Sequence, residues 1–122
     1  MKKVLIVDDD AETRTLMKRI LSVEDFIVLE AANGETALEI ARDKLPDLVI
    51  SDIMMENING FMLFEFLRGD KSTENIPVIL ATGRAQMTGA WKMDPSVAYL
   101  EKPIAPDELL TAVRRMVKPS TK

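Results

Sequence analysis

The sequence contains neither cysteine nor histidine, and each absence limits the chemistry open to the chain. Without cysteine there are no disulfides, thiolate nucleophiles or cysteine-ligated metals, which fits a reducing compartment, and we expect the cytoplasm. Without histidine there is no imidazole general base, no imidazole metal ligand and no phosphohistidine on this chain. If the chain handles phosphoryl groups, carboxylates must do so.

Long apolar runs and clusters of positive charge are also missing. No apolar stretch approaches the roughly 20 residues of a membrane helix. The apolar run that opens the chain is stopped by Asp8, Asp9 and Asp10, so we interpret it as a strand and not as a signal peptide. The net charge of −4 disfavours a nucleic-acid surface, which needs clustered Lys and Arg. We expect no direct contact with membranes or nucleic acids.

The length and composition predict one globular domain. A chain of 122 residues is long enough for a single hydrophobic core, and 47% hydrophobic with 30% charged residues is ordinary for such a protein. We expect residues 1–118 to form the folded core and residues 119–122 a frayed tail.

Short apolar runs alternate with helical patterns along the chain. The runs are rich in Val, Ile and Leu, as in strands buried inside a parallel sheet, and they cover residues 3–7, 26–29, 48–50, 77–81 and 97–100. The helical pattern is weakest at residues 84–95, where Gly89 and Pro95 oppose a regular helix. This alternation predicts an α/β fold in which a five-stranded parallel sheet is doubly wound by helices.

Local features support the predicted helices. Asp10 and Asn33 are favourable N-caps, and Pro106 suits the first turn of the last helix. Apolar residues recur at helical spacing within residues 11–23, at Leu16, Met17, Ile20 and Leu21, which predicts the first helix. Residues 61–67 are apolar on nearly every side, which predicts a helix packed tightly against the sheet.

Polar residues stand where the predicted strands end. Asp8 and Asp9 follow the first strand, Asp52 the third, Thr82 the fourth and Lys102 the fifth. Because the carboxyl ends of parallel strands share one edge, where α/β sheets bind ligands, we expect these side chains to converge. Each alone could be a helix cap, a turn residue or a surface lysine. Their common position is what indicates function.

The converging groups suit phosphoryl chemistry. Several close carboxylates repel one another unless a cation lies among them, and Mg²⁺ with oxygen ligands resolves that repulsion. Lys102 supplies a positive charge for a phosphoryl oxygen, and Thr82 supplies a donor for another. Asp52 is then the best-placed nucleophile to form an acyl phosphate.

Four spaced motifs resemble those of receiver domains in two-component response regulators. They are IVDDD at 6–10, LVISD at 48–52 with Gly60 beyond it, ILATG at 79–83 and YLEKP at 99–103. The resemblance implies a flavodoxin-like (βα)5 fold with strand order 2-1-3-4-5. It also implies that Asp52 accepts a phosphoryl group from the phosphohistidine of a partner histidine kinase or phosphotransfer protein.

The resemblance further implies a metal site and a limited kind of catalysis. It assigns Mg²⁺ to Asp8, Asp9, Asp52 and the backbone carbonyl of Met54. It implies that the chain is no enzyme toward other molecules and catalyses only its own phosphorylation and dephosphorylation.

A switch and two tuning positions are implied as well. Thr82 and Lys102 would bind phosphoryl oxygens, while Thr82 moves and Tyr99 turns inward behind it, reshaping a surface that contacts a downstream protein or a fused output domain. From the sequence alone, Tyr99 is a strand aromatic that packs. Met54 and Arg84 stand where the family varies residues that tune loss of the phosphoryl group, and apolar Met54 is expected to prolong the phosphorylated state. A cis peptide bond is implied after Lys102.

Two other functions stay open at this point. One is a receiver-like interaction module that never uses phosphate, which failure to bind Mg²⁺ would reveal. The other is a small phosphatase of the haloacid dehalogenase type, because residues 8–10 contain Asp-x-Asp. Ala11 and Glu12 depart from that family's pattern, and turnover dependent on Asp8 rather than Asp52 would favour it.

Overall fold

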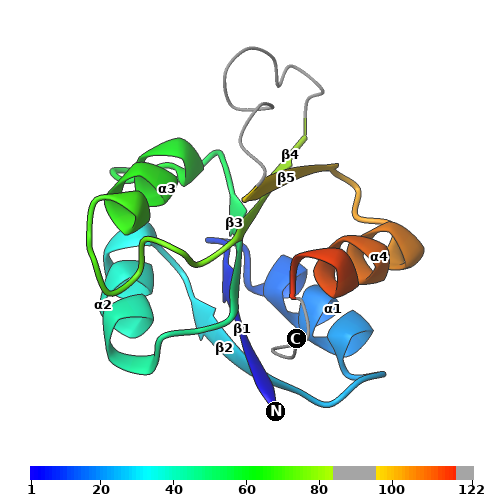
Figure 1. Ribbon diagram of the computed structural model, residues 1–122. Coiled ribbons are helices and arrows are strands. Elements are labelled where there is room, and N and C mark those ends of the chain that lie inside the picture. Colours follow the sequence, from blue (N-terminus) through cyan, green and yellow to red (C-terminus); the bar gives the residue numbers. More distant parts are fainter. Residues whose placement is uncertain (84–95, 118–122) are drawn as a thin grey trace.

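The computed structural model describes residues 1–83 and 96–117, which form a parallel sheet between two layers of helices (Figure 1). The strands are β1 (Lys2–Val7), β2 (Phe26–Ala31), β3 (Leu48–Asp52), β4 (Val78–Thr82) and β5 (Val97–Glu101). All neighbouring pairs are parallel, in the order β2-β1-β3-β4-β5. This confirms the predicted doubly wound α/β fold and its strand order.

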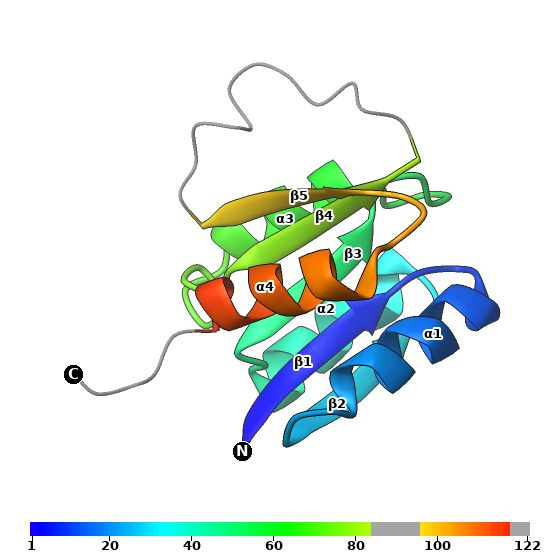
Figure 2. The ribbon, with the colours of Figure 1, turned by 90° about the vertical axis from the view of Figure 1, so that its right-hand side faces the viewer.

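The described helices cover both faces of the sheet. They are α1 (Ala11–Leu21), α2 (Gly34–Lys44), α3 (Gly60–Arg68) and α4 (Pro106–Met116). Helices α1 and α4 share one face, and α2 and α3 share the other (Figures 1 and 2). The weak helical pattern predicted at 84–95 and the tail predicted at 119–122 lie outside the described residues. Among the described helices, none has the length and apolar character needed to cross a membrane.

The hydrophobic core lies in two clusters separated by the sheet. Strand side chains that pack with α2 and α3 include Leu5, Val7, Val49 and Leu80. Those that pack with α1 and α4 include Val4, Ile6, Ile50 and Ile79. Since both faces are covered, the central strands need apolar residues at successive positions, which explains their continuous apolar runs.

Side-chain caps fix where several helices begin. Asp10 caps α1 and accepts a hydrogen bond of 2.6 Å from the hydroxyl of Thr13. Asn33 caps α2 and Asn59 caps α3, each accepting a bond from a backbone N–H of the first turn. Pro106 lies in the first turn of α4. The predicted roles of Asp10, Asn33 and Pro106 are confirmed.

Helix α3 packs against the sheet as predicted, but both it and α1 leave apolar side chains exposed. Leu16 is 43% exposed, because the buried stripe of α1 is formed by the residues that follow it, beginning at Met17. Helix α3 buries Leu63 and its neighbours on one side, but Met62 is 40% and Phe66 46% exposed. A helix presents only one side to a sheet, so an apolar residue on the opposite side stays in contact with solvent.

Candidate functional site

Three carboxylates meet at the edge of the sheet where β1 and β3 end. Asp8, Asp9 and Asp52 each place a carboxylate oxygen so that all three oxygens lie within 4.8 Å of one another. The side chains of Asp8 and Asp52 are buried, whereas Asp9 is exposed. The site is therefore acidic, partly shielded from solvent and accessible on the side of Asp9.

Lys102 reaches this cluster from the end of β5. Its Nζ lies 3.0 Å from Oδ2 of Asp8 and 3.2 Å from Oδ1 of Asp52. Its backbone N–H donates to the carbonyl of Thr82 at 2.7 Å, which ties the segment after β5 to the end of β4. The peptide bond between Lys102 and Pro103 is cis, as the resemblance implied. One ammonium thus contacts two buried carboxylates.

Burial and charge shift two pKa values in the cluster. Burial raises the pKa of Asp52, and the neighbouring charge of Asp8 raises it further, while the ammonium of Lys102 opposes both effects. Burial disfavours the charge on Lys102, but its hydrogen bond to Asp8 and the charges of Asp52 and Asp8 outweigh burial and raise the pKa of the ammonium. The cluster holds more negative than positive charge. Its donor set of carboxylate oxygens fits a hard divalent cation such as Mg²⁺.

Three of the other predicted site residues, Thr82, Met54 and Tyr99, lie in the described part of the chain. Thr82 is the buried last residue of β4, and its neighbour Ala81 pairs with Asp52 across the sheet. Met54 follows β3 in an exposed loop, with 73% of its surface accessible. Tyr99 lies in β5, directly opposite Leu80 of β4, and is half-buried. Arg84 lies outside the described residues.

Close backbone packing fixes the loop that follows Asp52. A Cβ atom at Gly60 would lie 2.7 Å from the carbonyl oxygen of Asp52 and 2.8 Å from Cα of Ile53, so only glycine allows this approach. The backbone N–H of Gly60 donates to the carbonyl of Ile53 at 3.0 Å. Asn57 takes a left-handed conformation with φ of 66°, which asparagine tolerates. The start of α3 is therefore held against the end of β3.

Features that sequence reasoning did not find adjoin the cluster. A pocket of 460 Å³ opens beside Asp9, and its walls are formed by Ile53, Met54, Met55, Glu56, Asn59 and Phe61. The run of apolar residues after Asp52 is the only sequence feature that points to it. Arg14 of α1 donates to the backbone carbonyl of Asp8 at 2.7 Å, a contact that depends on how the helix returns over the sheet.

Comparison with known proteins identifies the family. The sequence model described as "Response regulator receiver domain" matches residues 4–114. The chain belongs to the family of response regulator receiver domains. The resemblance read from the motifs is confirmed, and so is the predicted class of function, a receiver domain of two-component signal transduction.

Individual relatives agree with this identification. The receiver domain is 34% identical to protein PilH of Pseudomonas aeruginosa over 96% of this chain and 98% of that protein. It is 35% identical to the transcriptional regulatory protein CpxR of Escherichia coli over 98% of this chain. The chemotaxis protein CheY4 of Vibrio cholerae has a similar structure, with a TM-score of 0.83, 29% identity and coverage of 95% of this chain and 98% of that one.

Several relatives are much longer than this receiver domain. The chain spans 51% of the length of CpxR, 47% of a ycf27 regulator of Guillardia theta and 8% of a histidine kinase of Formosa agariphila. Receiver domains thus occur both in proteins of about this length and as parts of larger ones.

Proposed function

We propose that this receiver domain accepts a phosphoryl group on Asp52 from the phosphohistidine of a histidine kinase or phosphotransfer protein. The observation that carries the proposal is the bridge of Lys102 between Asp8 and Asp52, with the carboxylate of Asp9 beside them. A buried nucleophile, a cation and spare metal-binding oxygens are then within reach of one another. The chain acts on its own aspartate only, in the cytoplasm, and contacts neither membrane nor nucleic acid itself.

In the proposed reaction, a carboxylate oxygen of Asp52 attacks the phosphorus of the phosphohistidine. A P–O bond forms at Asp52, the P–N bond breaks, and its electron pair returns to the imidazole of the donor. Lys102 already lies on Oδ1 of Asp52, so its ammonium can bind a phosphoryl oxygen as the bond forms. Thr82, at the end of β4 on the same edge, supplies a hydroxyl to another phosphoryl oxygen.

Four groups would hold the proposed Mg²⁺: the carboxylates of Asp8, Asp9 and Asp52 and the backbone carbonyl of Met54. When bound there, the ion supplies positive charge that offsets the negative charge of the phosphoryl oxygens. The ion would share with Lys102 the neutralisation of the buried carboxylates of Asp8 and Asp52. Exposed Asp9 lies where an ion and its remaining water ligands can enter.

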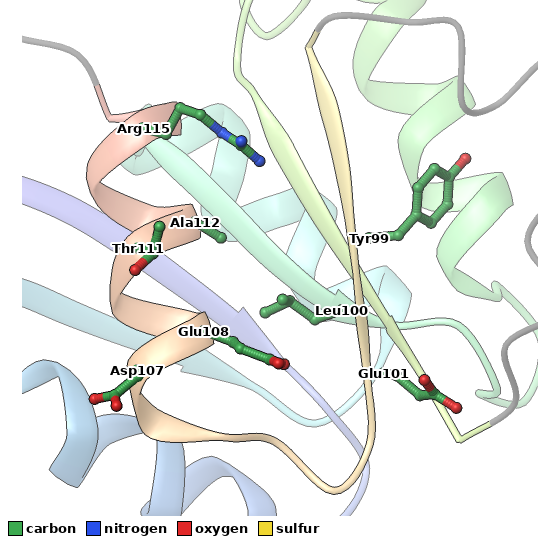
Figure 3. A pocket seen from close by; sticks show the side chains of 8 residues that line it. All are labelled: Tyr99, Leu100, Glu101, Asp107, Glu108, Thr111, Ala112 and Arg115. Carbon is green, nitrogen blue, oxygen red and sulfur yellow. The ribbon is translucent and has the colours of Figure 1, made fainter.

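The proposed output surface is a groove between β5 and α4 (Figure 3). It has a volume of 390 Å³ and is lined by Tyr99, Leu100, Glu101, Asp107, Glu108, Thr111, Ala112 and Arg115. Figure 3 shows Leu100 directed toward α4 and Tyr99 on the opposite side of the strand. Strand β4 joins the site to this surface, because Thr82 ends β4 while Leu80 pairs with Tyr99. A shift of Thr82 toward the phosphoryl group would therefore displace β5, where a downstream protein or a fused output domain binds.

The proposal is tested by mass spectrometry of the intact protein after incubation with Mg²⁺ and acetyl phosphate. We expect one phosphoryl adduct that hydroxylamine removes, because hydroxylamine cleaves acyl phosphates but not phosphate esters of hydroxyl groups. Asp52→Asn should give no adduct. Asp47→Asn is the matched control, because Asp47 lies before β3 and accepts from the N–H of Lys3, at the far end of the same strand. An adduct that resists hydroxylamine, or one that persists in Asp52→Asn, would contradict the proposal.

A further inference from the structure

Arg14 joins helix α1 to the first strand-end loop of the site. Its Nη1 donates to the backbone carbonyl of Asp8 at 2.7 Å, and its Nε donates to Oε1 of Glu30 at 3.1 Å. The side chain of Arg14 is 18% exposed, so its contact with Asp8 is partly buried, while its contact with Glu30 lies at the surface. The guanidinium therefore links three elements: the loop after β1, helix α1 and strand β2.

Every polar atom of Asp8 has a hydrogen-bond partner, and Arg14 is the partner of its backbone carbonyl. The N–H of Asp8 donates to the carbonyl of Ala31 at 3.1 Å, and its carbonyl accepts from Arg14. Its Oδ1 accepts from the N–H of Asp10 at 2.9 Å, and its Oδ2 accepts from Lys102 at 3.0 Å. Asp8 is fully buried, so loss of the Arg14 donor would leave its carbonyl without that hydrogen bond.

Arg14 also holds the other end of the acidic turn, the three residues Asp8, Asp9 and Asp10. Its backbone N–H donates to the carbonyl of Asp10 at 3.1 Å, while its side chain holds the carbonyl of Asp8. The side chain of Arg14 thus contacts one end of the turn, and the first backbone hydrogen bond of α1, which any residue at position 14 would form, closes the other. Asp9, between them, is exposed and depends on the turn for its position.

Glu30 orients the guanidinium of Arg14. It lies on β2 opposite Ile6 of β1, close to the start of the acidic turn. Its two carboxylate oxygens contact two successive turns of α1, Oε1 at Arg14 and Oε2 at Lys18 with 3.6 Å. Arg14 is consequently held on one side by a carboxylate, while its Nη1 donates to the carbonyl of Asp8 in the acidic turn.

We propose that Arg14, oriented by Glu30, is a positioning residue that arranges the acidic turn for Mg²⁺. The inference rests on the proposed function, since it concerns the same metal site. Arg14 does not touch the ion: it fixes the backbone from which Asp8 and Asp9 extend. Groups that orient metal ligands in this indirect way commonly change metal affinity when they are removed.

Charge and positioning predict opposite effects, which makes the inference testable. A positive charge beside a cation site repels the cation, so its removal by Arg14→Gln should strengthen Mg²⁺ binding if charge alone mattered. If Arg14 positions the turn, the same substitution weakens binding. Arg14→Lys keeps the charge but loses the planar fork that reaches Asp8 and Glu30 together, so it should also bind Mg²⁺ more weakly than the wild type.

The experiment is a calorimetric titration with Mg²⁺ alone, accompanied by urea unfolding to show that each variant is folded. We expect the dissociation constant of Arg14→Gln to rise about tenfold. The matched control is Arg42→Gln, which removes an ion pair of 3.0 Å with Asp70, formed on another helix away from the site. Its Mg²⁺ affinity should equal that of the wild type. If the wild type binds Mg²⁺ and Arg14→Gln binds it equally or more tightly, the positioning role of Arg14 is overturned. The proposed function is not contradicted by that result.

A second measurement needs no metal. Hydrogen exchange of the Asp10 amide, which donates to Asp8, should be faster in Arg14→Gln than in the wild type and unchanged in Arg42→Gln. Glu30→Gln should also weaken Mg²⁺ binding, and should do so less in the Arg14→Gln background if Glu30 acts through Arg14. A wild type that binds no Mg²⁺ would overturn the proposed function, and unchanged exchange at Asp10 would contradict the positioning role whatever the metal does.

Discussion

The ammonium of Lys102 lies 3.2 Å from the carboxylate of Asp52, at the ends of strands that are not neighbours in the sheet. The same Nζ contacts Asp8 at 3.0 Å, so one cation serves two buried acids. This arrangement leaves Asp52 with a pKa raised by burial even though a lysine touches it. The negative charge of the cluster is therefore only partly balanced by Lys102.

The raised pKa of Asp52 predicts how stability depends on pH without Mg²⁺. Because the folded protein binds this proton more tightly than the unfolded chain, its contribution to stability is present below the unfolded pKa and is lost as pH rises through the folded pKa. Asp52→Asn has no carboxylate to ionise at this position, so the variant does not lose this stability as pH rises. With chelator at pH 7, we expect the variant to have a larger free energy of unfolding than the wild type, by about 1 kcal/mol, a common size for one substitution.

Urea unfolding over a pH series checks this expectation. The wild type should lose stability relative to Asp52→Asn as pH rises from acid to neutral. A variant that is less stable than the wild type at pH 7 without metal would mean that the contact with Lys102 outweighs burial.

Mg²⁺ should stabilise the wild type through the acidic cluster. A ligand at a hundredfold excess over its dissociation constant adds about 2.7 kcal/mol to the free energy of unfolding. Asp9→Asn should lose most of this gain, with little change in metal-free stability, because Asp9 is exposed. Asp10→Asn should retain the gain, since asparagine caps α1 as well as aspartate does. Thermal melts with and without Mg²⁺ measure both effects, and an equal gain in Asp9→Asn would remove Asp9 from the metal site.

The exposed side chain of Met54 should slow hydrolysis of the acyl phosphate. It offers no hydrogen bond to an attacking water, whereas the amide of Met54→Asn would. A hydrogen bond worth ~1 kcal/mol in the transition state corresponds to about fivefold faster loss of the phosphoryl group. Decay of the phosphoryl adduct after removal of acetyl phosphate gives the rate. Met62→Asn, at an exposed position on α3, is the control and should decay as the wild type does. Slower decay in Met54→Asn would refute this role.

Gly60 should tolerate no side chain. Its Cβ would meet the backbone at 2.7 Å from the carbonyl oxygen of Asp52, and backbone cannot move aside as a flexible side chain can. We expect Gly60→Ala to lower the free energy of unfolding by about 1–3 kcal/mol. Gly69→Ala is the control, because its Cβ would lie 3.5 Å from the nearest carbonyl oxygen. Urea unfolding of both variants compares them, and equal stabilities would show that the loop after β3 is not closely held.

Much of the site follows from the sequence because its residues stand at strand ends. Asp8, Asp52, Thr82 and Lys102 each end or follow an apolar run, and a parallel sheet brings such ends to one edge. The contact between Lys102 and Asp8 joins residues far apart in the chain, yet the strand order alone brings their strand ends to that edge.

Other features depended on packing that periodicity does not encode. The contact of Arg14 with Asp8 and Glu30 requires α1 to pack beside β1 and β2, so no local sequence pattern predicts it. The exposure of Leu16 and Phe66 shows the same limit, because apolar spacing defines a stripe but not how much of it is covered.

The account is tested most directly by locating the phosphoryl group. After incubation with Mg²⁺ and acetyl phosphate, borohydride reduces an acyl phosphate and converts the modified aspartate to homoserine, which tandem mass spectrometry of peptides can assign to one position. We predict homoserine at position 52 and nowhere else. Homoserine at position 8 or 9 would favour phosphatase-like chemistry on the first acidic turn, and its absence from the whole chain would contradict Asp52 as the phosphoryl acceptor.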